Sequence, residues 1–370
     1  MNAYYLAGRA ARFALPALPT LLSVVTSFVL FVLFLAFQGK PALEACRLVF
    51  EGAFGSSFAW ESTLQRAAPL MLTALCVALP ARAGLIIIGG EGALVLGGLA
   101  AATVPLWLTG LTPPVTLIAM GLVSMSVGGL WVGLNGWLRQ KRGLNETIGS
   151  LLLSYIAIAL FNHLVEGPLR DPASLNKPST VGLDYSLMIG LISEDYFRVH
   201  WGLVAGIIVC MLAYVLIRHS VTGFALDVVG GNIRTARMLG LPVDRLIIFT
   251  CVMGGAAAGL AGMFEVSAVQ GSANASLIAG YGIGGILVSF AARHNPLAII
   301  LCATLVGGIE ASGSLLQRRL DLPDATTLIL QGILFTNLLA WESLMGRITQ
   351  WRMTLEHQTI ESKGAEVQHG

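Results

Sequence analysis

Charge is scarce in this sequence. Asp, Glu, Lys and Arg together make up 11% of its 370 residues, whereas hydrophobic residues make up 55%. A soluble domain carries about 25% charged residues, so this deficit excludes an ordinary water-soluble protein. The formal net charge of +2 provides no strongly basic surface, and we expect no nucleic-acid partner.

The sequence also lacks the residue patterns of most catalytic sites. Its five cysteines form no CxxC pair, and its six histidines show no metal-ligand spacing. Gly39 and Lys40 precede a proline and lack the upstream glycine of a P-loop, so the chain has no Walker A motif for ATP. Gly280, Gly282 and Gly285 satisfy GxGxxG, but no βαβ unit surrounds them. We therefore expect no catalytic residue, no metal and no cofactor, and hence no enzyme.

Long apolar runs are abundant instead. A helix needs about 20 apolar residues to cross ~30 Å of hydrocarbon, and about ten segments are candidates. These segments are Pro19–Phe37, Ala67–Leu79, Leu85–Leu108, Val115–Leu138, Ile148–Val165, Trp201–Ile217, Leu246–Val269, Ile283–Phe290, Leu297–Ser312 and Thr326–Leu344. The first is too long for a signal-peptide core, so we expect it to be retained as a span. The expected fold class is an all-α polytopic membrane protein with about ten transmembrane segments, including discontinuous helices.

The distribution of Lys and Arg predicts the orientation. Cytoplasmic loops are enriched in these residues, and most of the 22 Lys and Arg residues fall on one side when the N-terminus is placed inside. We therefore expect both termini in the cytoplasm, with an N-terminal segment at 1–18, a transmembrane domain at 19–345 and a tail at 346–370.

Residues 166–200 are then expected to face outward. They form either a docking surface or lid, or an ordinary solvated loop, and the sequence favours neither. Their acidic side chains are Glu166, Asp171, Asp184, Glu194 and Asp195.

Glycines interrupt two of the apolar runs in comparable ways. The stretch 82–93 reads RAGLIIIGGEGA, and the stretch 280–296 reads GYGIGGILVSFAARHNP. Paired interruptions in the two halves of a transporter indicate discontinuous helices around a central pathway. Close helix packing through small residues explains them equally well.

Three glutamates lie within apolar runs: Glu91, Glu265 and Glu310. A carboxylate at the centre of a membrane helix costs about 2.5–3.5 kcal/mol on insertion scales, so each should face the bundle interior or a cavity. A pathway residue or a proton site would use such a group. Glu91, between Gly90 and Gly92, could instead cap a helix N-terminus freed by the glycine break.

The longest polar interruption on the predicted cytoplasmic side is Arg218–Arg245. Asn232 can cap a helix that runs from Ile233 to Leu239, and Gly240 suits a left-handed terminator. A helix of two turns is too short to be stable alone, so it needs a partner surface. Either another protein or anionic lipid headgroups could provide that surface.

Several motifs in this order resemble the inner-membrane permease subunits of bacterial ABC importers of the nucleoside, simple-sugar and branched-chain amino-acid type. Arg82–Gly92 is similar to the family's R-x-G-L/I-F-N-I-G-x-E-G, and Gly143–Ala157 to its G-x-N-E-x-I-x-x-L-M-L-N-Y-I-A. Glu166–Pro172 continues into a similar G-P-x-x-D-P, Gly223–Leu241 resembles the family's coupling-helix segment, and Gly280–Pro296 resembles G-Y-G-F-x-x-I-x-V-A-L-L-x-x-x-x-P. The sequence departs from these patterns at Ile87, Ala93 and Ser154, where the family carries Asn, Gln and Asn.

The resemblance implies a multi-pass permease of the bacterial inner membrane that carries a nucleoside or a simple sugar. It implies four partners: a separate ATPase subunit, a second permease (itself or a paralogue), an external solute-binding protein and the lipid bilayer. The ATPase-coupling residues expected are Gly223, Asn232, Arg234, Ala236, Arg237 and Gly240. The translocation-pathway residues expected are Gly89, Gly90, Glu91, Gly92, Asn145, Glu146, Glu265 and Tyr281. The alternative function is a proton-coupled secondary transporter that uses Glu265 or Glu310.

Overall fold

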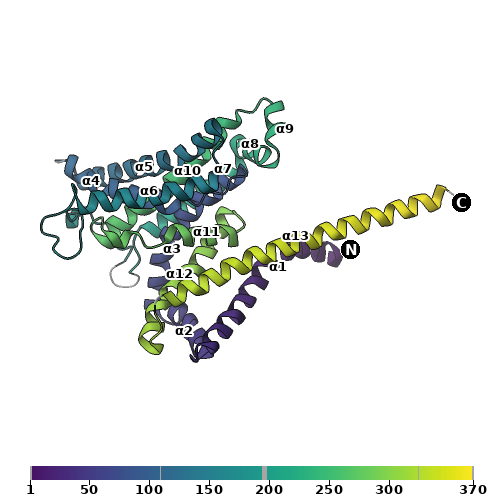
Figure 1. The fold of residues 1–370 in the computed structure, drawn as a ribbon, viewed down its shortest axis with the longest axis horizontal. Helices are drawn as coiled ribbons and strands as arrows, with labels where there is room; N and C mark the ends of the chain where they lie inside the picture. Colours follow the sequence, from purple (N-terminus) through teal and green to yellow (C-terminus); the bar gives the residue numbers. More distant parts are fainter. Residues whose placement is uncertain (1, 109, 194–197, 324, 369–370) are drawn as a thin grey trace. The chain divides into compact units, whose positions relative to one another are not determined.

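The computed structural model of the chain describes residues 2–108, 110–193, 198–323 and 325–368. Within them, nine helices are long and apolar enough to cross a membrane. Each of the predicted segments overlaps a helix, and the all-α transmembrane fold class is confirmed. The chain divides into two compact units, Met1–Leu48 with Gln317–Gly370, and Val49–Leu316 (Figure 1).

The first unit is built from two long helices, α1 (Asn2–Phe37) and α13 (Ala325–Gln368). Thr26 on α1 joins them, because its hydroxyl lies 3.3 Å from Asn337 Oδ1 and accepts a hydrogen bond from Trp341 Nε1 at 3.0 Å. The apolar parts of these two helices that are long enough to cross a membrane are Thr20–Phe37 and Ala325–Met345.

The second unit contains the remaining elements. In chain order after α2 (Ala42–Phe54), these are α3 (Ser57–Arg82), α4 (Gly90–Trp107), α5 (Pro113–Arg142), α6 (Glu146–Glu166), η1 (Tyr185–Leu187), α7 (Gly202–His219), α8 (Val221–Gly231), α9 (Ile233–Met238), α10 (Val243–Phe264), η2 (Glu265–Gln270), η3 (Ala275–Leu277), α11 (Tyr281–Ala291) and α12 (Pro296–Leu320). The residues of α2 up to Leu48 and the residues of α12 from Gln317 onward belong to the first unit.

Helix α10 packs against α4 and α5 at backbone distance. A Cβ atom on Gly97 would lie 2.5 Å from the Cα of Gly259, and a Cβ atom on Gly128 would lie 2.8 Å from the same Cα. Any side chain at these positions would push the helices apart, so the abundant glycines serve close helix contact.

Two predicted segments differ from the structure at their ends. The run Leu85–Leu108 is not one helix, because α4 begins only at Gly90 and the residues before it are not helical. The run at Ala67–Leu79 is part of a longer helix, α3, whose start is capped by the Ser56 hydroxyl at 3.1 Å from the amide of Ala59. The first turns of α3 carry polar side chains, so a search for apolar runs misses the start of this helix.

Helix α11 is also too short to cross a bilayer. Its 11 residues span about 16 Å, whereas hydrocarbon is ~30 Å thick. It follows the π-helical turn Glu265–Gln270 that continues α10, and residues 271–280 connect the two. The second glycine-rich stretch therefore contains a discontinuous helix, as predicted.

Candidate pathway and coupling site

The two broken segments meet at the starts of their helices. Glu91, in the first turn of α4, extends its carboxylate to the start of α11. It accepts hydrogen bonds from the amides of Gly280 at 2.8 Å and Gly282 at 2.5 Å. A Cβ atom on Gly282 would overlap the backbone of Glu91, so only glycine permits this approach.

Electrostatics favours this arrangement. A helix N-terminus carries about half a positive charge, and the N-termini of α4 and α11 both lie at the Glu91 carboxylate. Glu91 is only 6% exposed, so these amides replace water as its hydrogen-bond donors. Glu91 thus caps a helix N-terminus, but the capped helix is α11, across the bundle from its own.

Helix α6 supplies polar partners for the non-helical segment before α4, residues 85–89. The Thr147 hydroxyl donates to the carbonyl of Ile86 at 3.0 Å, and the Ser150 hydroxyl accepts from the amide of Ile88 at 3.0 Å. The Ser154 hydroxyl accepts from the amide of Gly92 at 3.2 Å. These hydroxyls satisfy backbone groups that a broken helix leaves without partners.

The spacing of these three residues, i, i+3 and i+7, places them on one face of α6. We did not identify Thr147 and Ser150 from the sequence. Their helical spacing beside a glycine-rich break is the signal that could have revealed them. The family carries Asn where this chain has Ser154, but the Ser154 hydroxyl still accepts a hydrogen bond from the amide of Gly92.

The predicted pathway glycines lie in the same place. Gly89 directly precedes α4, and a Cβ atom there would lie 3.2 Å from the Cβ of Ser150. Gly90 begins the helix, and a Cβ atom on Gly92 would lie 2.9 Å from the Cβ of Ala157. Because these residues are small, the non-helical segment before α4 can lie against α6.

Asn145 and Glu146 have local partners. The Asn145 side chain caps α6 by accepting from the amides of Thr147 at 3.0 Å and Ile148 at 3.1 Å. Glu146 pairs with Arg139 at 3.2 Å between Oε2 and Nε. Both residues therefore stabilise the start of α6, the helix whose hydroxyls bond to the non-helical segment before α4.

Glu265 and Tyr281 form a second polar cluster. Glu265, at the start of the π-helical turn, is 4% exposed, and Tyr281, the first residue of α11, is 9% exposed. No hydrogen bond or ion pair joins either side chain to another residue that the structure describes. Arg66, Glu91 and Glu310 are near enough to act electrostatically on both. A carboxylate and a phenol so placed can exchange hydrogen bonds with a polar solute.

The loop between α6 and α7 is hydrogen-bonded to the π-helical turn and to the residue after it. Its Ile189 amide donates to the carbonyl of Ser267 on the π-helical turn at 2.9 Å, and its Leu183 amide donates to the carbonyl of Gly271 at 2.8 Å. Of its predicted acidic residues, Glu166, Asp171 and Asp184 are placed in the structure, whereas Glu194 and Asp195 lie outside the described residues.

At the opposite end of α7, the structure contains the predicted short helix. Asn232 Oδ1 accepts from the amides of Arg234 at 2.9 Å and Thr235 at 3.2 Å, and α9 runs over Ile233–Met238. Gly240 has the left-handed φ of 74° that was expected of a terminator. This local prediction is confirmed.

The two faces of α9 differ in exposure. Ala236 is buried against the bundle, whereas Leu239 is 66% exposed. Arg237 contacts Asp244 at 3.5 Å, and Arg234 is exposed. The neighbouring Met238 is 80% exposed, so the outer face of α9 is both basic and apolar.

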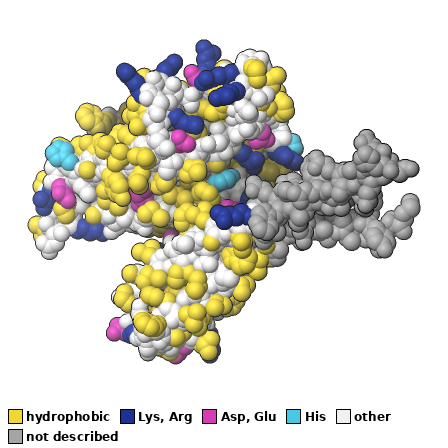
Figure 2. Space-filling model, turned by 45° about the vertical axis from the view of Figure 1, so that its right-hand side comes forward, with side chains coloured by type: hydrophobic (Ala, Val, Ile, Leu, Met, Phe, Trp, Pro, Cys, Tyr) yellow, Lys and Arg dark blue, Asp and Glu magenta, His cyan; other side chains and the backbone are white. Residues whose placement is uncertain are grey.

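The surface around α8 and α9 is basic. Figure 2 shows Lys and Arg side chains gathered at the top of the view, the end of the second unit that carries α8 and α9 in Figure 1. Gly223 shapes the entry to this region, because a Cβ atom there would overlap the carbonyl of Ile217. Its amide donates to the Ser220 hydroxyl at 3.0 Å, which caps α8.

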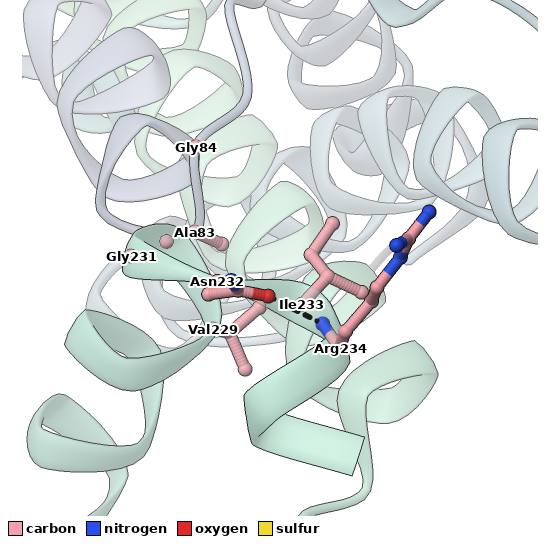
Figure 3. Close-up of a pocket in the computed structure, with 8 residues that line it drawn as sticks. Ala83, Gly84, Val229, Gly231, Asn232, Ile233 and Arg234 are labelled. Atoms are coloured by element: carbon pink, nitrogen blue, oxygen red, sulfur yellow. Dashed lines mark hydrogen bonds between the residues drawn. The ribbon is translucent and has the colours of Figure 1, made fainter. Parts of the chain in front are cut away.

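A cleft of about 400 Å³ separates the start of α9 from the turn after α3. Figure 3 shows Ala83 and Gly84, from the turn after α3, beside Gly231, Asn232 and Ile233 at the start of α9. Among the described residues, no group of three or more His, Cys, Asp or Glu side chains is gathered as metal ligands would be.

Comparison with known proteins identifies the family. Residues 59–339 match the family described as the permease component of branched-chain amino acid transport systems. The glucose ABC transporter permease protein TsgB13 of Haloferax volcanii is 31% identical over 81% of each chain. The guanosine permease NupP of Bacillus subtilis is 29% identical over 71% of this chain and 75% of its own. The nucleoside permease NupB of Lactococcus lactis is 25% identical over 71% and 74%.

These matches confirm the resemblance that the motifs indicated. The family match covers most of the second unit and reaches into α13. The chain belongs to the family of permease components of branched-chain amino acid transport systems.

Proposed function

We propose that the chain is the transmembrane permease subunit of an ABC importer in a bacterial inner membrane, and that it carries a nucleoside or a simple sugar. A separate ATPase would drive it, a second permease would pair with it, and an external solute-binding protein would deliver the solute. Family membership supports this proposal, as do relatives named for glucose, guanosine and nucleosides.

The observation that carries the coupling role is the structure of α9. This six-residue helix is too short to be stable alone, and of its side chains only Ala236 is buried in the bundle. Its outer face presents Arg234, Met238 and Leu239, a mixture of charge and apolar surface that suits a groove on another protein. We assign this end to the cytoplasm, where an ATPase could contact it.

The α4–α11 junction is the centre of the proposed pathway. Broken backbone is tolerated at membrane depth only when it is buried in protein or lines a watery cavity. Glu265 and Tyr281 would offer hydrogen bonds to the hydroxyl and N–H groups of a passing solute. Glu91 and the glycines around it would hold α4 and α11 together while the solute moves past.

The experiment is ATP-driven uptake by the assembled complex. The permease is purified from native membranes in mild detergent with its partners and reconstituted into proteoliposomes, and uptake of radiolabelled glucose and guanosine is measured with and without ATP. The charge-reversal pair Arg234→Glu and Arg237→Glu should weaken ATPase binding about tenfold, since exposed charge contacts contribute up to around 1 kcal/mol each. Lys141→Glu is the matched control at the end of α5.

Two results would contradict the proposal. Unchanged ATPase co-purification in the double variant would remove α9 from the coupling surface. Uptake that needs no ATPase, follows a proton gradient and is lost in Glu265→Gln would establish the proton-coupled alternative.

A further inference from the structure

Arg82 lies where three segments of the second unit meet. It is the last residue of α3, and its Nη1 lies 3.8 Å from the carboxylate of Asp227 on α8. Its Nη2 donates to the carbonyl of His294, in the turn between α11 and α12, at 3.5 Å. The Nε of Arg82 is buried and has no hydrogen-bond partner among the described residues. The Arg82 side chain thus joins α8 to the turn after α11. We call α8 and α9 together, residues 221–238, the coupling segment.

The backbone contact at this point is equally close. A Cβ atom on Gly230, near the end of α8, would overlap the carbonyl oxygen of Arg82. Gly84, two residues after Arg82, has a left-handed φ of 76°. A Cβ atom at this position would lie 3.5 Å from the carbonyl oxygen of Gly230. Helix α8 therefore cannot move toward the end of α3 without displacing it.

The turn that receives Arg82 has an uncommon backbone conformation. Arg293 and His294 have φ values of 51° and 56°, in the left-handed region that few residues with a Cβ occupy. The His294 ring contacts the Ser289 hydroxyl at 2.9 Å and lies 4.9 Å from the Phe290 ring. Burial and the Arg82 charge lower the pKa of His294 to about 4, so the imidazole is neutral at physiological pH and can accept from Ser289.

The other end of α11 is bound to Glu91 through Gly280 and Gly282. A hydrogen-bonded helix of 11 residues moves as one body. A displacement at the turn after α11 is therefore delivered at the start of α4. The sequence of contacts from the coupling segment to the junction is continuous: α8, Arg82, His294, α11 and Glu91.

We propose that Arg82 is a positioning residue that transmits movement of the α8–α9 segment to the α4–α11 junction. This inference rests on the proposed function, since it assumes that an ATPase moves α9. Arg82 contacts neither solute nor ATP in this role. It acts by holding the Asp227 carboxylate and the His294 carbonyl to one guanidinium, whose several donors can serve both at once.

The test compares Arg82→Gln, Asp227→Asn and the double variant in the reconstituted permease–ATPase complex. Basal ATP hydrolysis and solute uptake are measured together, and their ratio gives the solute carried per ATP. We expect that ratio to fall about 3- to 30-fold in Arg82→Gln, the range found for mutations that alter coupling between sites. The double variant should be no worse than Arg82→Gln, because both remove the same link. Lys141→Gln, an exposed cation at the same end, should leave the ratio unchanged.

A second measurement needs neither ATPase nor solute. Hydrogen exchange of the Gly280 and Gly282 amides is followed in the purified permease, where Arg82→Gln should accelerate it at least threefold while exchange within α5 stays constant. Arg82→Lys should restore part of the protection, because a lysine reaches only one of the two acceptors at a time.

The outcomes separate the two proposals. Unchanged exchange and an unchanged uptake-to-hydrolysis ratio in Arg82→Gln overturn the role of Arg82, whatever the wild type carries. Loss of ATPase co-purification in that variant also overturns it, because Arg82 would then belong to the docking surface. Absence of ATP-driven uptake in the wild type, with accelerated exchange in the variant, overturns the proposed function and leaves the mechanical link intact.

Discussion

The side chains that cap α9 and α11 differ in the distance along the chain that each cap bridges. Asn232 caps α9 from the adjacent position in the chain, and it is exposed. Glu91 caps α11 across a separation of 189 residues to Gly280, and it is buried. The first cap shapes only its own segment. The second holds two halves of the bundle together, so its loss should affect the whole unit.

The largest expected effect comes from breaking the buried cap by bulk. Gly282→Val would place a branched side chain against the backbone of Glu91, and we expect a loss of about 3 kcal/mol or more in the free energy of unfolding. Thermal unfolding in detergent measures it. Ile283→Ala is the control, since the neighbouring Ile283 is exposed. Equal melting temperatures for Gly282→Val and wild type would show that α4 and α11 do not meet at this position.

A smaller effect should follow from removing the charge at the same place. Glu91→Gln keeps the shape and one acceptor oxygen but loses a charge-assisted hydrogen bond and the interaction with two helix N-termini. We expect a cost of about 2 kcal/mol, read by the same unfolding measurement. Glu166→Gln, at the exposed end of α6, should change stability little. A Glu91→Gln protein as stable as wild type would mean that the carboxylate is not the cap.

The smallest effect should come from the exposed cap. Asn232→Ala removes the acceptor for two amides, which costs about 1 kcal/mol in α9. Hydrogen exchange should accelerate in α9 alone, and the melting temperature of the bundle should stay the same. Asn232→Asp retains a capping oxygen and should protect α9 as the wild type does. A fall in bundle stability in Asn232→Ala would contradict the local character of this cap.

The comparison also explains what the sequence could and could not predict. The α9 cap was predicted, because Asn232, the short helix and Gly240 are neighbours in the chain and each has a local conformational preference. The apolar runs were predicted for the same reason, since hydropathy is a property of a short window.

Contacts between segments far apart in the sequence could not be predicted, because local patterns do not show which segments pack together. The sequence indicated that Glu91 could cap a helix, but it could not say that α11 is the helix. The hydroxyls of Thr147 and Ser150 serve a segment about 60 positions earlier, at separations of 61 and 62 residues. The exposure of Leu239 likewise depends on how α9 lies on the bundle, which helical periodicity alone does not determine. The roles of Glu265 and Tyr281 in a pathway stay predictions.

The Glu91 cap also has a consequence for how the protein is made. Glu91 emerges from the ribosome 189 residues before Gly280, which at roughly 5–20 residues per second is about 10–40 s. During that interval α4 enters the membrane with its carboxylate lacking the α11 amides, at the insertion cost of about 2.5–3.5 kcal/mol for such a group. The hydroxyls of α6 arrive much sooner and can hold the segment before α4 in place. The Glu91 cap can therefore form only after the start of α11 has been synthesised.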